Sequence, residues 1–140
     1  MKRMLLIGRT GCGKTTLVQA VNRLEKVYRK TQAMEFHANM IDTPGEYVEN
    51  RFFYRALLVA SAECDIIALV QACGDEGCIF PPGFASCFPK PVIGIVTKVD
   101  SEGCRKAETA RHLERSGAKE IYATSSVTGE GMETVRKLLE

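Results

Sequence analysis

The sequence has little excess charge of either sign and no long hydrophobic run. Nineteen basic side chains against 17 acidic ones leave a formal net charge of +2, which gives no broad electrostatic attraction toward nucleic acid or an anionic membrane. No apolar run approaches the roughly 18 residues that a membrane span needs, and no small-residue cleavage signal follows the first apolar stretch. We therefore expect a cytoplasmic protein without nucleic-acid or membrane partners, whose ligands must be inferred from a local site.

The chain also lacks a secretion signal and any histidine near its central cysteines. Without such a signal, we expect its six cysteines to stay reduced. They are Cys12, Cys64, Cys73, Cys78, Cys87 and Cys104. The spacings of Cys73, Cys78 and Cys87 fit no compact zinc pattern, which disfavours a metal site there and leaves a redox role open.

Short apolar segments alternate with helix-like ones along the whole chain. With 45% apolar residues, positions 1–140 are expected to form one domain around one core. Strands are predicted over 3–8, 33–42, 65–72, 91–97 and 120–125, most of them nearly continuous in apolarity, as in buried parallel sheets. Helices are predicted over 14–26, 47–62, 105–115 and 130–139. The alternation predicts an α/β fold with helices on both faces of the sheet.

One segment interrupts this alternation. Residues 73–91 hold four of the five prolines and three of the cysteines. Proline cannot continue a helix or donate to a sheet, so we expect a long irregular crossover with at most one helical turn.

The stretch GRTGCGKT, residues 8–15, matches the spacing G-x-x-x-x-G-K-[ST]. Its glycines let successive backbone N–H groups point inward toward phosphate oxygens. Lys14 supplies a mobile charge for the terminal phosphates, Thr15 supplies a hydroxyl for Mg²⁺, and the following helix directs its positive end to the same place. The nucleotide-binding candidates of this loop are Gly8, Arg9, Thr10, Gly11, Cys12, Gly13, Lys14, Thr15 and Thr16.

A second motif, DTPGEY, starts at Asp42 at the end of the second predicted strand. Ligands of open α/β sheets bind beyond the carboxyl ends of the strands, which is where this carboxylate is expected. Asp42 can hold the magnesium ion through a water, and the backbone N–H of Gly45 can reach the terminal phosphate.

The motif TKVD, Thr97 to Asp100, follows the fourth predicted strand and favours guanine. The Asp100 carboxylate can accept hydrogen bonds from guanine N1–H and its exocyclic amine, while Lys98 can lie over the base. Adenine would present an acceptor nitrogen instead, a mismatch worth roughly 10⁴-fold in discrimination. The stretch TSSVTGEG adds Ser125, Ser126 and Val127, and the Ser126 N–H can reach guanine O6.

In this order the four motifs resemble the translation-factor-like branch of small GTPases. A closer resemblance lies in KTQAMEF (30–36), IDTPGEYVENRFFYRALL (41–58) and PVIGIVTK. These segments are similar to the EutP and PduV proteins, small P-loop proteins of ethanolamine- and propanediol-utilization microcompartment operons. The resemblance implies a three-layer, Ras-like P-loop fold and a Mg²⁺ ion bound with GTP or GDP. It also implies that Thr31 is the first-switch threonine and a third magnesium ligand, beside Thr15 and Asp42.

Two departures from the Ras-like pattern affect these expectations. Glu46 stands where those proteins carry a glutamine that orients the attacking water, so unaided hydrolysis is expected to be slow. Only 11 positions separate Thr31 from Asp42, whereas two ordinary strands of about five residues and a turn need roughly 12. We therefore expect about five mainly parallel strands, no antiparallel edge strand, and an edge strand from Ala33 that is open to a partner.

Two classes of function remain open. In the first, the protein is a guanine-nucleotide switch that hydrolyses GTP slowly and docks on microcompartment shell or enzyme proteins through residues 31–60. In the second, it is an ATP- or GTP-dependent phosphotransferase, because the resemblance implies the acetate kinase activity attributed to EutP-type proteins. The catalytic candidates are Lys14, Thr15, Asp42, Gly45 and Glu46. We favour the first class because TKVD favours guanine.

Two further expectations concern single side chains. Cys12 lies in the phosphate loop near a lysine and a helix N-terminus, so its pKa should be lowered if it is exposed, and oxidation should then inhibit the protein. Tyr47, Phe52, Phe53 and Tyr54 cannot all point inward from one helix, so one or two are expected on the surface as a contact for a partner.

Overall fold

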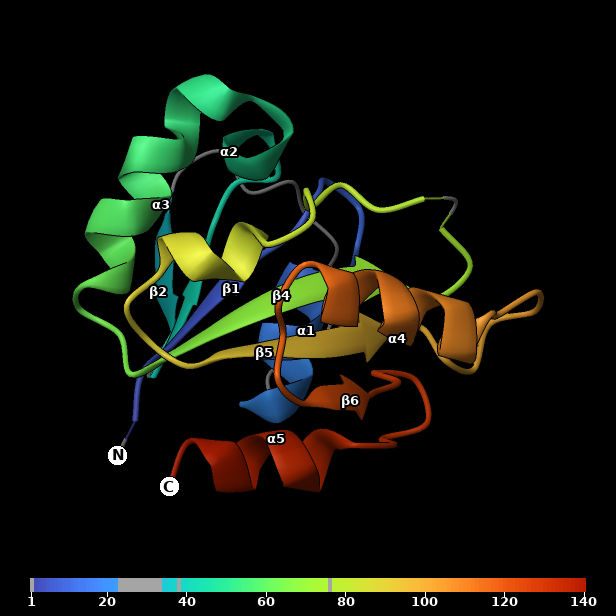
Figure 1. Ribbon diagram of the computed structural model, residues 1–140. Coiled ribbons are helices and arrows are strands. Elements are labelled where there is room, and N and C mark those ends of the chain that lie inside the picture. The colour runs from blue at the N-terminus through green and yellow to red at the C-terminus, as the bar shows by residue number, and fades with distance from the viewer. Residues whose placement is uncertain (1, 23–33, 38, 76) are drawn as a thin grey trace.

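A computed structural model describes residues 2–22, 34–37, 39–75 and 77–140, and Figure 1 shows them as one sheet between two layers of helices. Within these residues the sheet is formed by β1 (Met4–Ile7), β2 (Glu35–His37), β3 (Met40–Asp42), β4 (Ile66–Ala72), β5 (Val92–Thr97) and β6 (Ile121–Ala123). Their order in space is β2-β3-β1-β4-β5-β6. Every neighbouring pair from β3 to β6 is parallel, which confirms the predicted α/β fold with five parallel strands.

The predicted absence of an antiparallel edge strand is wrong. β2 pairs antiparallel with β3, with Glu35 opposite Asp42 and His37 opposite Met40. Each strand has three residues, and only positions 38 and 39 lie between them. The hairpin therefore needs far fewer positions than two ordinary strands would, and the single strand expected over 33–42 is a hairpin.

The two faces of the sheet have separate cores. Successive residues of a strand point to opposite faces, so Leu5 and Ile7 pack with one cluster while Met4 and Leu6 pack with the other. The first cluster lies under α2 (Glu46–Glu49), α3 (Tyr54–Ser61), η2 (Phe84–Cys87) and α4 (Lys106–Arg115). The second lies under α1 (Lys14–Val21) and α5 (Met132–Leu138), on the other side in Figure 1.

The helices differ from the predicted ones mainly at one residue. Asn50 has extended backbone angles (φ −126°, ψ 117°), and its side chain accepts a hydrogen bond from Phe52 N–H at 3.0 Å. This cap starts a new 3₁₀ turn, η1 (Arg51–Phe53), and divides the helix predicted over 47–62 into α2, η1 and α3. Over the described part of 73–91, η2 is the one helical turn, as predicted. No helix in the part of the chain that the structure describes is long and apolar enough to cross a membrane.

Candidate functional site

The loop between β1 and α1 is tightly curled around Lys14. A Cβ atom on Gly8 would lie 2.5 Å from the carbonyl oxygen of Val70 and 2.7 Å from the Cys12 sulfur, so only glycine fits there. The buried Lys14 folds back over the loop, where its Nζ donates to the carbonyl oxygens of Gly8 (2.6 Å) and Arg9 (3.2 Å). The loop therefore holds a cation at the N-terminal, positive end of α1, an arrangement suited to an anion.

Two of the three predicted magnesium ligands meet beside this loop. Thr15 Oγ1 donates to Asp42 Oδ2 at 2.6 Å, and Asp42 is fully buried at the carboxyl end of β3. The next residue, Thr43, fixes the turn by donating from its hydroxyl to Leu6 O at 2.7 Å. A hydroxyl and a carboxylate are hard oxygen donors that fit a Mg²⁺ ion. Thr31, the third predicted ligand, lies outside the described residues.

The segment after Asp42 packs directly on the phosphate loop. A Cβ atom on Gly45 would lie 2.1 Å from the backbone nitrogen of Thr10, so this approach also requires glycine. Glu46 is exposed at the start of α2, and Glu49 Oε1 accepts a hydrogen bond from Thr10 N–H at 3.0 Å. Sequence reasoning missed Glu49. The signal that could have found it is its position three residues after Glu46, on the same side of a helical turn.

The base motif TKVD is joined to the phosphate loop. The Thr97 hydroxyl donates to Cys12 O, and Lys98 Nζ donates to Gly11 O at 2.8 Å. Lys98 also has φ +58°, a left-handed conformation that is uncommon outside glycine and concentrates at functional sites. The structure therefore brings together two motifs that lie more than 80 positions apart in the sequence.

The loop after β6 completes the arrangement. The hydroxyl of the buried Ser125 donates to Asp100 Oδ1 at 2.6 Å and accepts from Thr128 N–H at 3.1 Å. Ser125 thus positions the carboxylate that was predicted to select the base. Ser126 is half-buried on the same loop, while Val127 is 80% exposed.

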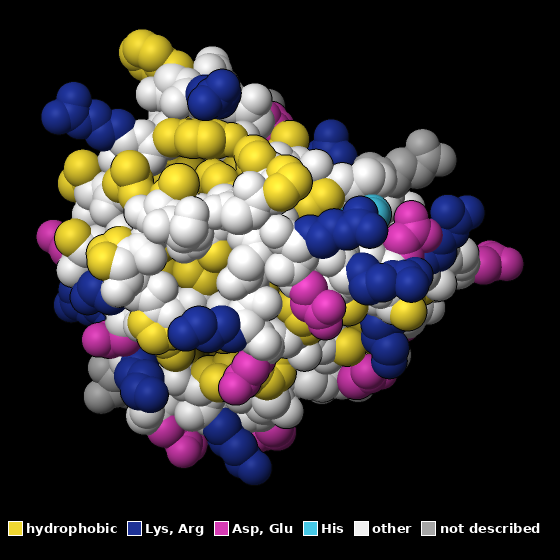
Figure 2. All heavy atoms as spheres, viewed as in Figure 1, with side chains coloured by type: hydrophobic (Ala, Val, Ile, Leu, Met, Phe, Trp, Pro, Cys, Tyr) yellow, Lys and Arg dark blue, Asp and Glu magenta, His cyan; other side chains and the backbone are white. Residues whose placement is uncertain are grey.

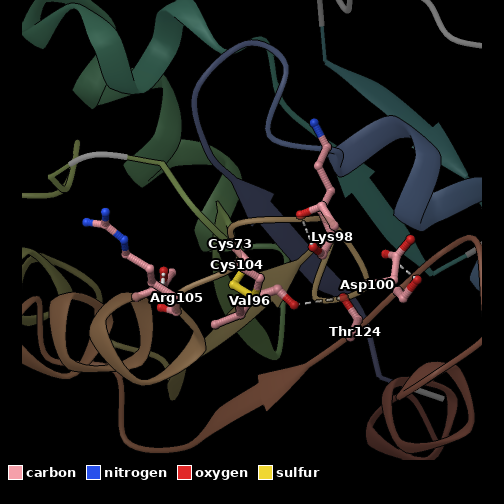
Figure 3. Close-up of a disulfide and its surroundings, with 10 residues drawn as sticks. Cys73, Val96, Lys98, Asp100, Cys104, Arg105 and Thr124 are labelled. Carbon is pink, nitrogen blue, oxygen red and sulfur yellow. Dashed lines mark hydrogen bonds between the residues drawn. A yellow bond between two sulfur atoms is a disulfide. The ribbon is translucent and has the colours of Figure 1, made fainter.

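The prediction that all six cysteines stay reduced is wrong. Cys73 and Cys104 form a disulfide, shown in Figure 3, with their Cα atoms 5.0 Å apart. Cys73 directly follows β4 and Cys104 closes the turn that follows β5, and the sequence spacing alone does not predict that these two strands are neighbours. Within the described residues, no group of three or more His, Cys, Asp or Glu side chains gathers as metal ligands.

The reactivity predicted for an exposed Cys12 does not apply, because the structure buries this side chain. The side chain is 1% exposed. Burial raises the pKa of its thiol above the ordinary value of 9.0, although the neighbouring Lys14 charge opposes that shift. Cys12 is therefore a packing residue of the loop and not an activated thiol.

An apolar surface adjoins the second motif, as the aromatic cluster predicted. Phe52 is 83% exposed and Val59 is 67% exposed. Figure 2 shows hydrophobic side chains gathered at the end of the molecule that carries α2 and α3, whereas charges of both signs are interspersed over α4. A groove of about 650 Å³ lies between α3 and the edge of the sheet. It is lined by Met34, Ile41, Tyr47, Arg55, Ala56, Val59, Ala60 and Glu63.

Comparisons with known proteins agree on one family. The family described as "Ethanolamine utilisation - propanediol utilisation" matches residues 1–140. "Propanediol utilization protein PduV" of Citrobacter freundii is 42% identical over 134 residues, which cover 95% of this chain and 89% of that protein. "Probable acetate kinase EutP" of Salmonella typhimurium (strain LT2) is 33% identical over 142 residues, covering 100% of this chain and 88% of that protein. The protein of the same name from Escherichia coli (strain K12) is 34% identical over 122 residues, covering 86% and 77% of the two chains.

Proposed function

The chain belongs to the PduV–EutP family of ethanolamine and propanediol utilisation, and from this premise we propose that it binds guanine nucleotides and hydrolyses GTP slowly. The observation that carries the proposal is the hydrogen bond from Lys98 Nζ to Gly11 O at 2.8 Å. It joins the base motif to the phosphate loop, so that one nucleotide can contact both. The metabolic setting that we propose is an ethanolamine- or propanediol-type microcompartment.

Guanine is favoured over adenine by the environment of Asp100. The Ser125 hydroxyl holds Oδ1 of this exposed carboxylate at 2.6 Å, which orients the group. An oriented carboxylate accepts hydrogen bonds from guanine N1–H and the exocyclic amine, whereas adenine offers it no matching pair of donors.

A magnesium ion fits the paired oxygens of Thr15 and Asp42, and it would neutralise charge on the terminal phosphates. Lys14 would exchange its two carbonyl partners for phosphate oxygens, and the Gly45 N–H would orient the terminal phosphate. The exposed Glu46 stands where a neutral glutamine would orient water in Ras-like proteins. A carboxylate in this place is repelled by the phosphate, which supports slow hydrolysis.

The proposed partner is a microcompartment shell or enzyme protein. The exposed Phe52 and Val59 and the groove beside α3 support docking in this region, because such apolar surface is typical of contact sites. These residues follow the Gly45 segment in sequence, so docking would depend on the bound nucleotide.

A second candidate is a phosphotransferase that moves the terminal phosphate to a small acid such as acetate. The specific observation in its favour is the name "Probable acetate kinase EutP", carried by relatives 33–34% identical to this chain. It would use Lys14, Thr15 and Asp42 in the same way and would differ in the acceptor.

Product analysis separates the two candidates. Purified protein is incubated with GTP or ATP and Mg²⁺, with and without acetate, and inorganic phosphate and acetyl phosphate are measured. We expect slow release of phosphate from GTP that does not depend on acetate. Acetyl phosphate formed from either nucleotide would instead support the phosphotransferase, and formation of neither product from either nucleotide would count against both activities.

A further inference from the structure

A covalent bond holds the segment that follows the base motif. Cys73 is the residue after β4, and Cys104 lies four positions after Asp100. Figure 3 shows their disulfide lying between Asp100 and Arg105, the residue that precedes α4. We call residues 98–104, between β5 and Arg105, the base loop. The disulfide therefore connects the base loop to the end of β4, at the carboxyl ends of the strands, where the candidate site lies.

The base motif itself is held by the loop after β6, since Val99 N–H donates to Thr124 O (3.2 Å) and Asp100 Oδ1 accepts from Ser125 (2.6 Å). The hydrogen bonds of residues 101–104, in the turn that follows, are local. Ser101 donates to Lys98 O from its backbone N–H (3.0 Å) and from its hydroxyl (2.6 Å), and Cys104 N–H donates to Ser101 O (3.3 Å). Such bonds fix the shape of a turn without fixing its position relative to β4. The last backbone bond that ties the motif to this strand lies before the turn, from Cys73 N–H to Thr97 O at 2.8 Å. Beyond it, the disulfide supplies the attachment to β4.

The bridge is open to small reagents from one side. Cys104 is half-buried and residues 101–103 are exposed, whereas Cys73 is 7% exposed. A small thiolate can therefore attack the Cys104 sulfur, forming a mixed disulfide and releasing the Cys73 sulfur as a thiolate that takes up a proton. A second thiolate then frees Cys104 and leaves as the small-molecule disulfide. The reverse reaction needs an oxidant of the glutathione disulfide class, which accepts the two electrons and two protons of the cysteine pair.

We propose that the Cys73–Cys104 disulfide is a redox-controlled latch on the base loop. In the oxidised protein the turn after Asp100 is held against β4 and guanine nucleotides bind tightly. In the reduced protein the turn is released and the base is bound more weakly, while the phosphate loop is unchanged. The inference rests on the proposed guanine-nucleotide binding, to which it adds a regulation.

The test compares the affinity for GDP with that for tripolyphosphate, which lacks a base. The full chain is oxidised with glutathione disulfide or reduced with dithiothreitol. Titration of free thiols on a sample unfolded in denaturant confirms four or six per chain, the four being Cys12, Cys64, Cys78 and Cys87. Reduction is expected to weaken GDP binding roughly three- to tenfold, since the cross-link restricts the number of conformations that the base loop can adopt before the base binds. Tripolyphosphate affinity is expected to stay the same.

Two variants complete the test. Cys104→Ser is expected to bind GDP as the reduced protein does under both conditions, and Cys87→Ser, which removes an exposed free thiol, is expected to keep the response. Equal GDP affinity of the oxidised and reduced chain would overturn the latch, and so would an equal loss of tripolyphosphate affinity, which indicates general unfolding. Failure of GDP to bind in either state, with tripolyphosphate still bound, would reject guanine recognition and the latch with it.

Discussion

The carboxylate of Glu49 accepts a hydrogen bond from the backbone N–H of Thr10 at 3.0 Å, across 39 positions of the sequence. Thr10 belongs to the loop expected to hold the terminal phosphates, and backbone N–H groups of such loops are anion sites. The Glu49 carboxylate therefore engages a backbone N–H of this loop that could otherwise donate to a bound anion. A phosphate brought close to it would be repelled, so a bound triphosphate would favour movement of α2 away from the loop.

Glu49→Gln is expected to strengthen GTP binding roughly three- to tenfold and GDP binding less, because it removes one charge from an exposed site near the expected position of the terminal phosphate. Glu63→Gln, which changes an exposed glutamate beyond α3, is the matched control. The measurement is the ratio of the two dissociation constants for each variant. An equal shift for GTP and GDP would contradict the placement of Glu49 near the terminal phosphate.

Lys14→Ala is expected to weaken GTP binding about 100-fold, because two charge-assisted hydrogen bonds to phosphate, each worth about 1.5 kcal/mol, are lost. Lys14 is buried, bonded to two carbonyls of its own loop and 3.6 Å from the Cys12 sulfur, so its removal changes the packing around Gly8 and Cys12 and leaves the rest of both cores in place. Circular dichroism should therefore show an unchanged fold. Lys137→Ala, at an exposed position of α5, controls for the loss of a positive charge. Retained GTP affinity in Lys14→Ala would mean that this loop is not the phosphate site.

Cys12 is expected to resist alkylation. Because Cys12 is buried and burial raises the pKa of its thiol above 9.0, this thiol is mostly protonated at pH 8 and shielded from the reagent. Alkylation by iodoacetamide should therefore be at least about tenfold slower at Cys12 than at the exposed Cys87. The sign of the stability effect follows from the same shift. The Cys12 thiol of the unfolded chain ionises near pH 9.0, while that of the folded chain stays protonated. The contribution of this thiol to the free energy of unfolding is therefore fully present below pH 9.0 and is lost as the pH rises above it. Peptide mapping after timed alkylation measures both sites in one sample, and similar rates at Cys12 and Cys87 would show that Cys12 is accessible.

Most of the fold could be predicted because its strands are local and strongly apolar. β4 and β5, predicted over 65–72 and 91–97, are found at Ile66–Ala72 and Val92–Thr97. The β2–β3 hairpin could not be predicted, because strands of three residues carry too few positions for a period of two to be recognised.

The residues of the candidate site could be predicted where they belong to a short motif with a recognisable spacing. Lys14, Asp42 and Asp100 could be chosen from local patterns, and the shared edge of a parallel sheet explains why their loops meet. The contacts of Glu49 and of Cys73 with partners 39 and 31 positions away depend on the packing of whole elements. The spacing of Glu49 from Glu46 could have marked it as a candidate, but no local pattern identifies a partner so far away in the sequence, so these contacts required the structure.

Asp100→Asn is expected to exchange the base preference from guanine to xanthine. In the proposed complex the carboxylate would accept two hydrogen bonds from guanine, whereas an amide could donate to the additional carbonyl oxygen of xanthine. The Ser125 hydroxyl can donate to the amide oxygen as it now does to Oδ1, so the loop should keep its shape. Parallel titrations with GTP and xanthosine triphosphate should then show GTP binding weakened at least about 100-fold and xanthosine triphosphate binding strengthened. If both nucleotides lost affinity equally, Asp100 would be holding the loop through Ser125 and not selecting the base. The two outcomes therefore separate recognition of guanine by Asp100 from its structural bond to the β6 loop.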